Sequence, residues 1–120
     1  MIKVKRIYDA PGPDDGCRVL VDRLWPRGMT REAAAIDLWL REAAPSDALR
    51  RWYNHDSERW PGFQKRYRDE LAQAAAAAAL VPLRARLTEG DVTLLFATKE
   101  LLRNNAYALK AYLEATAIEP

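Results

Sequence analysis

Hydrophobic residues form three short runs that are typical of strands, with helical spacing between the last two. Residues 2–7 alternate apolar and charged side chains and fit a first strand. Residues 18–24 contain the apolar run VLV, which is typical of a strand buried on both faces. The continuous apolar run VTLLFA at 92–97 is the clearest strand of the chain. The turn-rich sequence DAPGPDDG at 9–16 predicts a loop between the first two strands.

The segment between the second and last strands is predicted to be largely helical. Ser46 is a good N-cap for one helix, and Asn54 can end it. The next helix carries an apolar stripe at spacings of three and four, made of Trp60, Phe63, Tyr67 and Leu71. A last helix is expected over about 101–115, with Leu102 on its apolar face. Residues 36–40, IDLWL, fit either a short strand or an extended segment.

The order of these elements predicts an α/β fold. The last strand follows a long helical crossover, which favours a parallel sheet covered by helices on both faces. We expect a single compact domain over residues 1–120, with a small, mainly parallel sheet flanked by helices.

Composition and net charge limit the kinds of partner, cofactor and cellular location that we expect for this protein. Nineteen basic and seventeen acidic residues give a net charge of +2, which is too balanced to indicate nucleic acid by itself. No run approaches the about 20 apolar residues that span a bilayer, so no membrane partner is expected. With Cys17 as the single cysteine no intrachain disulfide can form, which favours a cytoplasmic location. One cysteine and one histidine argue against a metal site, and without a glycine-rich phosphate loop we expect no cofactor.

Basic side chains follow the two inner strands. Arg23 and Arg27 lie in the sequence DRLWPRG after the second strand, and Lys99 follows the last strand. Because the carboxyl ends of parallel strands lie at the same edge of the sheet, we expect these three cationic side chains to converge there. The N-terminus of the last helix would add backbone N–H groups that favour anions. The pattern predicts a site for a phosphate or carboxylate.

Three more residues are candidates for this site, each with a structural alternative. Trp25 lies between the two arginines and either stacks on a ligand ring or closes the end of the sheet. Asn104 contacts a ligand or holds its loop, and His55 is either a general acid–base or a hydrogen-bonded helix-junction residue. For Arg23 the alternative is an ion pair with Asp22 or Asp37 that fixes the loop.

The same residues carry a family resemblance. RVLVDRLWPRG is followed by D-x-W-L, by APS, by L-R-x-W with a later H-D pair, and by W-x-x-F-x-x-R-Y-x-x-E-L. This succession resembles the bacterial family called domain of unknown function 488, in its YeaO-like branch, over nearly the whole chain. The resemblance implies a compact α/β protein of this size and no settled biochemical function. It also implies a histidine near the start of the last helix, where this chain has Arg103.

Two interpretations from different classes follow. In the first, the protein binds or acts on a small anionic ligand at the carboxyl ends of the strands, with His55 as the acid–base if it is an enzyme. In the second, it is a non-catalytic module for nucleic acid or a protein partner, because arginine is abundant and Trp25 and Tyr53 are aromatic candidates for contact. A homodimer held by tryptophans is a third interpretation.

Overall fold

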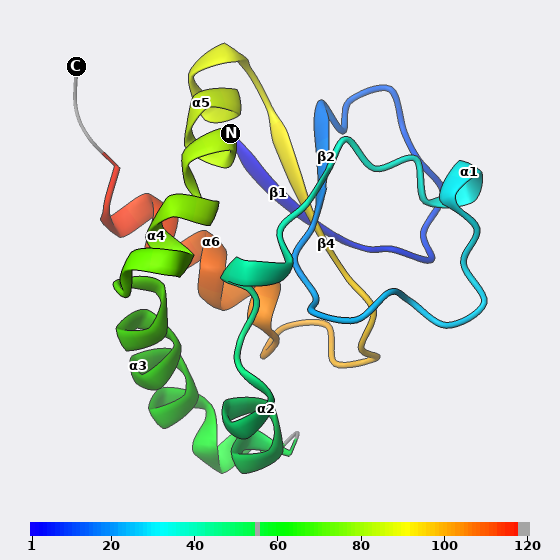
Figure 1. Cartoon of the computed structure of the whole chain (residues 1–120). Coiled ribbons are helices and arrows are strands. Elements are labelled where there is room, and N and C mark those ends of the chain that lie inside the picture. The colour runs from blue at the N-terminus through cyan, green and yellow to red at the C-terminus, as the bar shows by residue number, and fades with distance from the viewer. Residues whose placement is uncertain (55, 118–120) are drawn as a thin grey trace.

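One parallel sheet organises the protein, whose computed structural model describes residues 1–54 and 56–117. Within those residues the sheet has four strands in the order β1-β4-β2-β3, and every pairing is parallel (Figure 1). The strands are β1 Ile2–Arg6, β2 Cys17–Leu20, β3 Leu38–Trp39 and β4 Val92–Phe96. The predicted parallel α/β fold is confirmed, and the undecided segment 36–40 contains a two-residue edge strand.

The register brings the carboxyl ends of the inner strands to one edge of the sheet. Arg6 of β1 pairs with Phe96 of β4, and Leu20 of β2 pairs with Leu95. β2 ends earlier than the predicted strand over 18–24. The last hydrogen bond to β4 runs from the Val21 N–H to the Leu95 carbonyl at 3.1 Å, and the chain leaves the sheet after it. The segment that carries Arg23 and Arg27 is therefore a loop that starts beside the end of β4.

Helices begin and end largely where local signals predict. They are α1 Arg31–Ala34, α2 Asp47–Tyr53, α3 Trp60–Leu71, α4 Ala74–Ala79, α5 Val81–Glu89 and α6 Asn105–Ala115, with single 3₁₀ turns at Arg41–Ala43 and Ser57–Arg59. The Ser46 hydroxyl accepts from the Leu49 N–H at 3.1 Å, and Asn54 ends α2 in the left-handed conformation. None of the helices in the described part of the chain is long and apolar enough to cross a membrane.

The last helix starts four residues later than predicted. Asn104 is its N-cap, since the side-chain oxygen accepts from the Tyr107 N–H at 3.1 Å. Leu102 therefore lies in the preceding loop, where 69% of its surface is exposed, and its predicted place on the apolar face of the helix is wrong.

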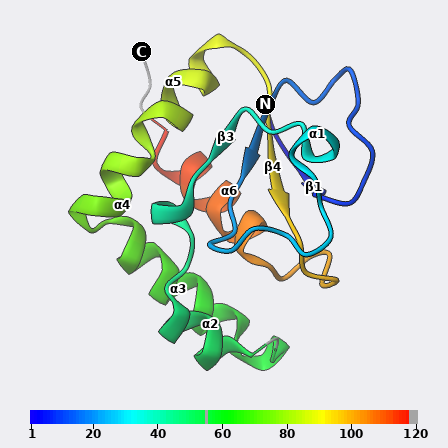
Figure 2. The same cartoon turned by 45° about the vertical axis from the view of Figure 1, so that its right-hand side comes forward.

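The two faces of the sheet are covered differently. Val19 and Leu94 face a large core that includes Phe63, Leu83 and Leu109, so α3, α5 and α6 cover one face (Figure 2). The other face forms a smaller cluster of Ile7, Leu20, Ala34 and Leu95, against which Trp25 and Trp39 pack. The short helix α1 and its flanking loops cover this second face, so helices lie on both faces of the sheet as the sequence pattern favoured.

A buried ion pair fastens α1 to the second face. Arg18 and Asp15 are both 5% exposed and lie 2.5 Å apart. The same guanidinium donates to the carbonyls of Ala34 and Ala35 at 2.9 and 3.1 Å, and Lys5 lies 3.1 Å from Asp15. Every charged group here has partners, which is the condition for burying charge at acceptable cost.

We predict that Asp15 makes the fold sensitive to acid. Burial tends to raise the pKa of Asp15, but hydrogen bonds from the Gly12 N–H, Lys5 and Arg18 outweigh it and lower the pKa to about 2. A depressed pKa stabilises the fold above the ordinary value, and this contribution is lost as the pH falls toward about 2. Urea midpoints of the unmodified protein should therefore fall between about pH 4 and about pH 2 more steeply than those of Asp15→Asn.

The control for this prediction is Asp69→Asn, because Asp69 makes an exposed ion pair with Lys65 on α3. Its pH profile should follow that of the unmodified protein. Parallel profiles for Asp15→Asn and the unmodified protein would show that the buried pair does not set the acid response.

Two glycines provide a second test of the packing. Both have positive φ, 64° at Gly16 and 77° at Gly28. A methyl group on Gly16 would lie 2.1 Å from the Asp91 carbonyl oxygen, whereas one on Gly28 would meet no atom within 4 Å. We expect Gly16→Ala to lower the free energy of unfolding by about 3 kcal/mol or more, against about 1 kcal/mol for Gly28→Ala, measured by urea unfolding. Equal losses would contradict the close approach of Asp91.

Candidate functional site

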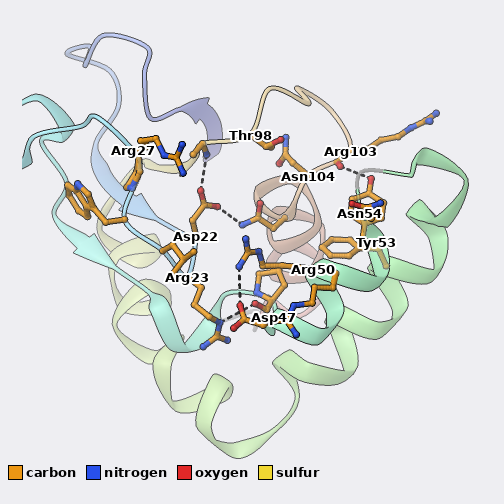
Figure 3. A pocket seen from close by; sticks show the side chains of 18 of the residues that line it. Asp22, Arg23, Arg27, Asp47, Arg50, Tyr53, Asn54, Thr98, Arg103 and Asn104 are labelled. Atoms are coloured by element: carbon orange, nitrogen blue, oxygen red, sulfur yellow. Dashed lines mark hydrogen bonds and ion pairs between the residues drawn. The ribbon is translucent and has the colours of Figure 1, made fainter.

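An open pocket of about 790 Å³ lies at the carboxyl ends of β2 and β4. Its walls come from the loop after β2, the end of β4, the start of α6 and helix α2 (Figure 3). The charged residues that line it are mainly arginines, namely Arg23, Arg27, Arg50, Arg51 and Arg103, together with Asp22 and Asp47. The sequence pattern placed a site at this edge, and this is where the structure places the pocket.

Asp22 joins three of the pocket walls. One carboxylate oxygen accepts from the Ala97 N–H and the other from the Asn105 side-chain amide, both at 2.9 Å. The same amide donates to the Val21 carbonyl at 2.9 Å. Burial raises the pKa of Asp22, while the hydrogen bonds from Asn105 and Ala97 and the charge of Arg50 counteract this. Asp22 therefore fixes the loop after β2 against β4 and α6.

Arg23 holds the segment that enters α2. Its Nε donates to the Pro45 carbonyl at 3.2 Å and its Nη2 to the Ala44 carbonyl at 3.0 Å. The alternative that Arg23 pairs with Asp22 or Asp37 is wrong in its partners, since Asp37 accepts from the Arg18 N–H instead. The structural role expected in that alternative is nevertheless observed, because the Arg23 guanidinium fixes a loop.

Arg27 and Arg50 reach the pocket from opposite sides. The Arg27 side chain points into it from the loop after β2, and that of Arg50 points toward Asp22 from α2 (Figure 3). Arg50 forms an ion pair with Asp47 at 3.0 Å, in which both side chains are about half exposed. Exposed pairs of this kind contribute little, about 0–1 kcal/mol, so an anionic ligand can displace Asp47 at small cost.

Sequence reasoning missed Arg50 as a site residue. Its position in the first turns of α2 marks only an exposed helical side chain. Nothing local indicates that α2 packs beside the end of β2.

Of the other predicted site residues, Trp25 and Asn104 line the pocket and Lys99 does not. Trp25 lines the pocket, but its ring packs at 5.3 Å from that of Trp39 and its Nε1–H donates to Met29, so it closes the end of the sheet. Asn104 also lines the pocket, where it is 3% exposed and caps α6. Lys99 is exposed and does not belong to the pocket lining.

His55 and Arg103 are the last two positions that the sequence singled out. His55 lies outside the described residues, so its predicted acid–base role stays a prediction. The side chain of Arg103 points away from the pocket, while its carbonyl accepts from the Tyr53 hydroxyl at 2.8 Å (Figure 3). No group of three or more potential metal ligands occurs among the residues that the structure describes.

We predict that Arg23 and Arg27 differ in their effect on stability. Arg23→Met removes two hydrogen bonds to partly buried carbonyls and should lower the free energy of unfolding by about 2 kcal/mol. Arg27→Met changes an exposed side chain and should stay within about 0.5 kcal/mol. Urea unfolding followed by tryptophan fluorescence measures both, and equal effects would argue against the structural role of Arg23.

Comparisons with known proteins assign the family. A family model described as "Inactive DUF488-N3 subclade" matches residues 1–119. The uncharacterized protein Rv3073c of Mycobacterium tuberculosis is 41% identical over 112 residues, which cover 93% of this chain and 92% of that protein. The uncharacterized protein YeaO of Escherichia coli is 35% identical over 114 residues, with 95% and 97% covered. No solved structure matches significantly. This chain is therefore a YeaO-like member of the DUF488 family.

Proposed function

We propose that this protein binds a small phosphate- or carboxylate-bearing anion in the pocket at the carboxyl ends of β2 and β4. The observation that carries the proposal is that the guanidinium groups of Arg27 and Arg50 point into a pocket whose lining holds two aspartates (Figure 3). One of these, Asp22, has both carboxylate oxygens bonded to Ala97 and Asn105. The pocket is thus built for negative charge.

Arg27 and Arg50 are the side chains best placed to hold the anion. They point into the pocket from opposite walls, and guanidinium groups bind phosphate and carboxylate through paired hydrogen bonds (Figure 3). Asn104 and Asn105 place the N-terminal turn of α6 at the same wall. The partial positive charge of that turn adds to the attraction for an anion.

The protein's family favours binding over catalysis. The model that matches this chain describes its subclade as inactive. Asp22 is a partly buried carboxyl group of the lining, and its hydrogen bonds serve to hold the walls together rather than to leave a base open to a ligand. We therefore propose recognition of the anion without turnover.

The test is a titration with inorganic phosphate and with citrate, followed by thermal unfolding and calorimetry. A ligand that binds only the folded state raises the unfolding temperature as its concentration increases. We expect Arg50→Met and Arg27→Met each to weaken binding by about tenfold or more, because each removes charge-assisted hydrogen bonds.

Arg68→Met is the matched control, since Arg68 is exposed on α3 and does not belong to the pocket lining. It should bind as the unmodified protein does. The proposal fails if neither anion stabilises the unmodified protein, or if all three variants respond alike. Binding of nucleic acid that weakens steeply with salt in the absence of any response to small anions would favour the module interpretation instead.

A further inference from the structure

Tyr8 presents an exposed aromatic ring at the wall of the pocket. It follows β1 by two residues, belongs to the lining and is 42% exposed. Its hydroxyl donates to the Arg27 carbonyl at 2.8 Å. The ring therefore lies on the same wall as the loop that carries the Arg27 guanidinium.

The position of this ring is fixed by its hydroxyl and by a contact over one ring face. The guanidinium carbon of Arg6 lies 4.9 Å from the ring centroid. Arg6 is held in turn by the carbonyls of Ala97 and Thr98, at 2.8 and 3.0 Å. Because the hydroxyl and the Arg6 contact restrain the side chain before any ligand arrives, stacking on it costs little conformational entropy.

Leu24 contributes further apolar surface to the pocket. It also lines the pocket, and 62% of its surface is exposed. A single exposed leucine or tyrosine is ordinary, but here both border one cavity. The volume of about 790 Å³ falls within the about 300–1,000 Å³ typical of pockets that enclose organic ligands, far more than a bare phosphate fills.

Resting on the proposed anion binding, we infer that the ligand is an organic monoanion or dianion that carries a flat aromatic ring, with Tyr8 as the stacking surface. The charged group is held by Arg27 and Arg50, and the ring lies against Tyr8 and Leu24. Ring-bearing phosphates of nucleoside monophosphate size fit this description. The same chemistry is offered by free molecules and by the phosphorylated end of a nucleic acid strand.

The experiment compares anions with and without an aromatic ring by calorimetry. The probes are inorganic phosphate, ribose 5-phosphate, phenyl phosphate and adenosine 5′-monophosphate. Stacking on an aromatic side chain should make the two aromatic probes bind about tenfold more tightly than ribose 5-phosphate. Tyr8→Ser should remove this gain and change the affinity for inorganic phosphate by less than the gain itself, whereas Tyr8→Phe keeps the ring and should keep most of the gain.

Leu24→Ser is a second, independent variant, because it removes apolar surface from the pocket wall without touching Tyr8. It should reduce the gain from the aromatic ring in part, and circular dichroism checks that each variant is folded. If phosphate binds but aromatic and non-aromatic probes bind equally, the inference is overturned and the proposed function stands. If no probe binds, both fail.

A final comparison separates the two sources of ligand. Short oligothymidylates with a 5′-phosphate or a 5′-hydroxyl are titrated alongside adenosine 5′-monophosphate. Preference for the phosphorylated strand over the mononucleotide assigns the site to strand ends, and preference for the mononucleotide assigns it to free ring phosphates. Either result supports a ring-bearing anion. A strand that binds more tightly than the mononucleotide, and equally well with a 5′-phosphate or a 5′-hydroxyl, contradicts it.

Discussion

The Asp22 carboxylate is the interaction on which the pocket depends. Where β2 leaves the sheet, its neighbour β4 would have an unpaired N–H at Ala97, and Asp22 accepts that hydrogen bond. Its second oxygen binds the Asn105 amide, which also reaches the Val21 carbonyl. A short polar side chain thus replaces the missing strand pairing and fixes two loops and a helix relative to one another.

This constraint divides the arginines of the chain into two groups. Arg18 and Arg23 donate hydrogen bonds to backbone carbonyls. These bonds hold α1 and the segment that enters α2. Arg27 and Arg50 instead point into the pocket, where solvent or an anion meets them. Whether backbone carbonyl groups lie within reach thus decides whether an arginine side chain fastens a loop or stays directed into the pocket (Figure 3).

The family relationship fits a binding role for the second group. The matching model describes an inactive subclade, and the uncharacterized relatives Rv3073c and YeaO align over nearly their whole length. The resemblance implied a histidine where this chain has Arg103, whose side chain points away from the pocket while its carbonyl accepts from Tyr53. The Arg103 side chain is therefore not among those that point into the pocket (Figure 3).

The sequence by itself determined three of the four described strands, the caps of α2 and the position of Arg23, Trp25 and Arg27 at the carboxyl edge, because apolar runs and capping act within a few residues. The tertiary structure decided which charges reach the pocket. Arg50 and Tyr8 enter it from α2 and from the end of β1, and Lys99 does not join the lining. These outcomes depend on how the helical crossover packs against the sheet. Local sequence patterns do not indicate which distant side chains that packing brings together.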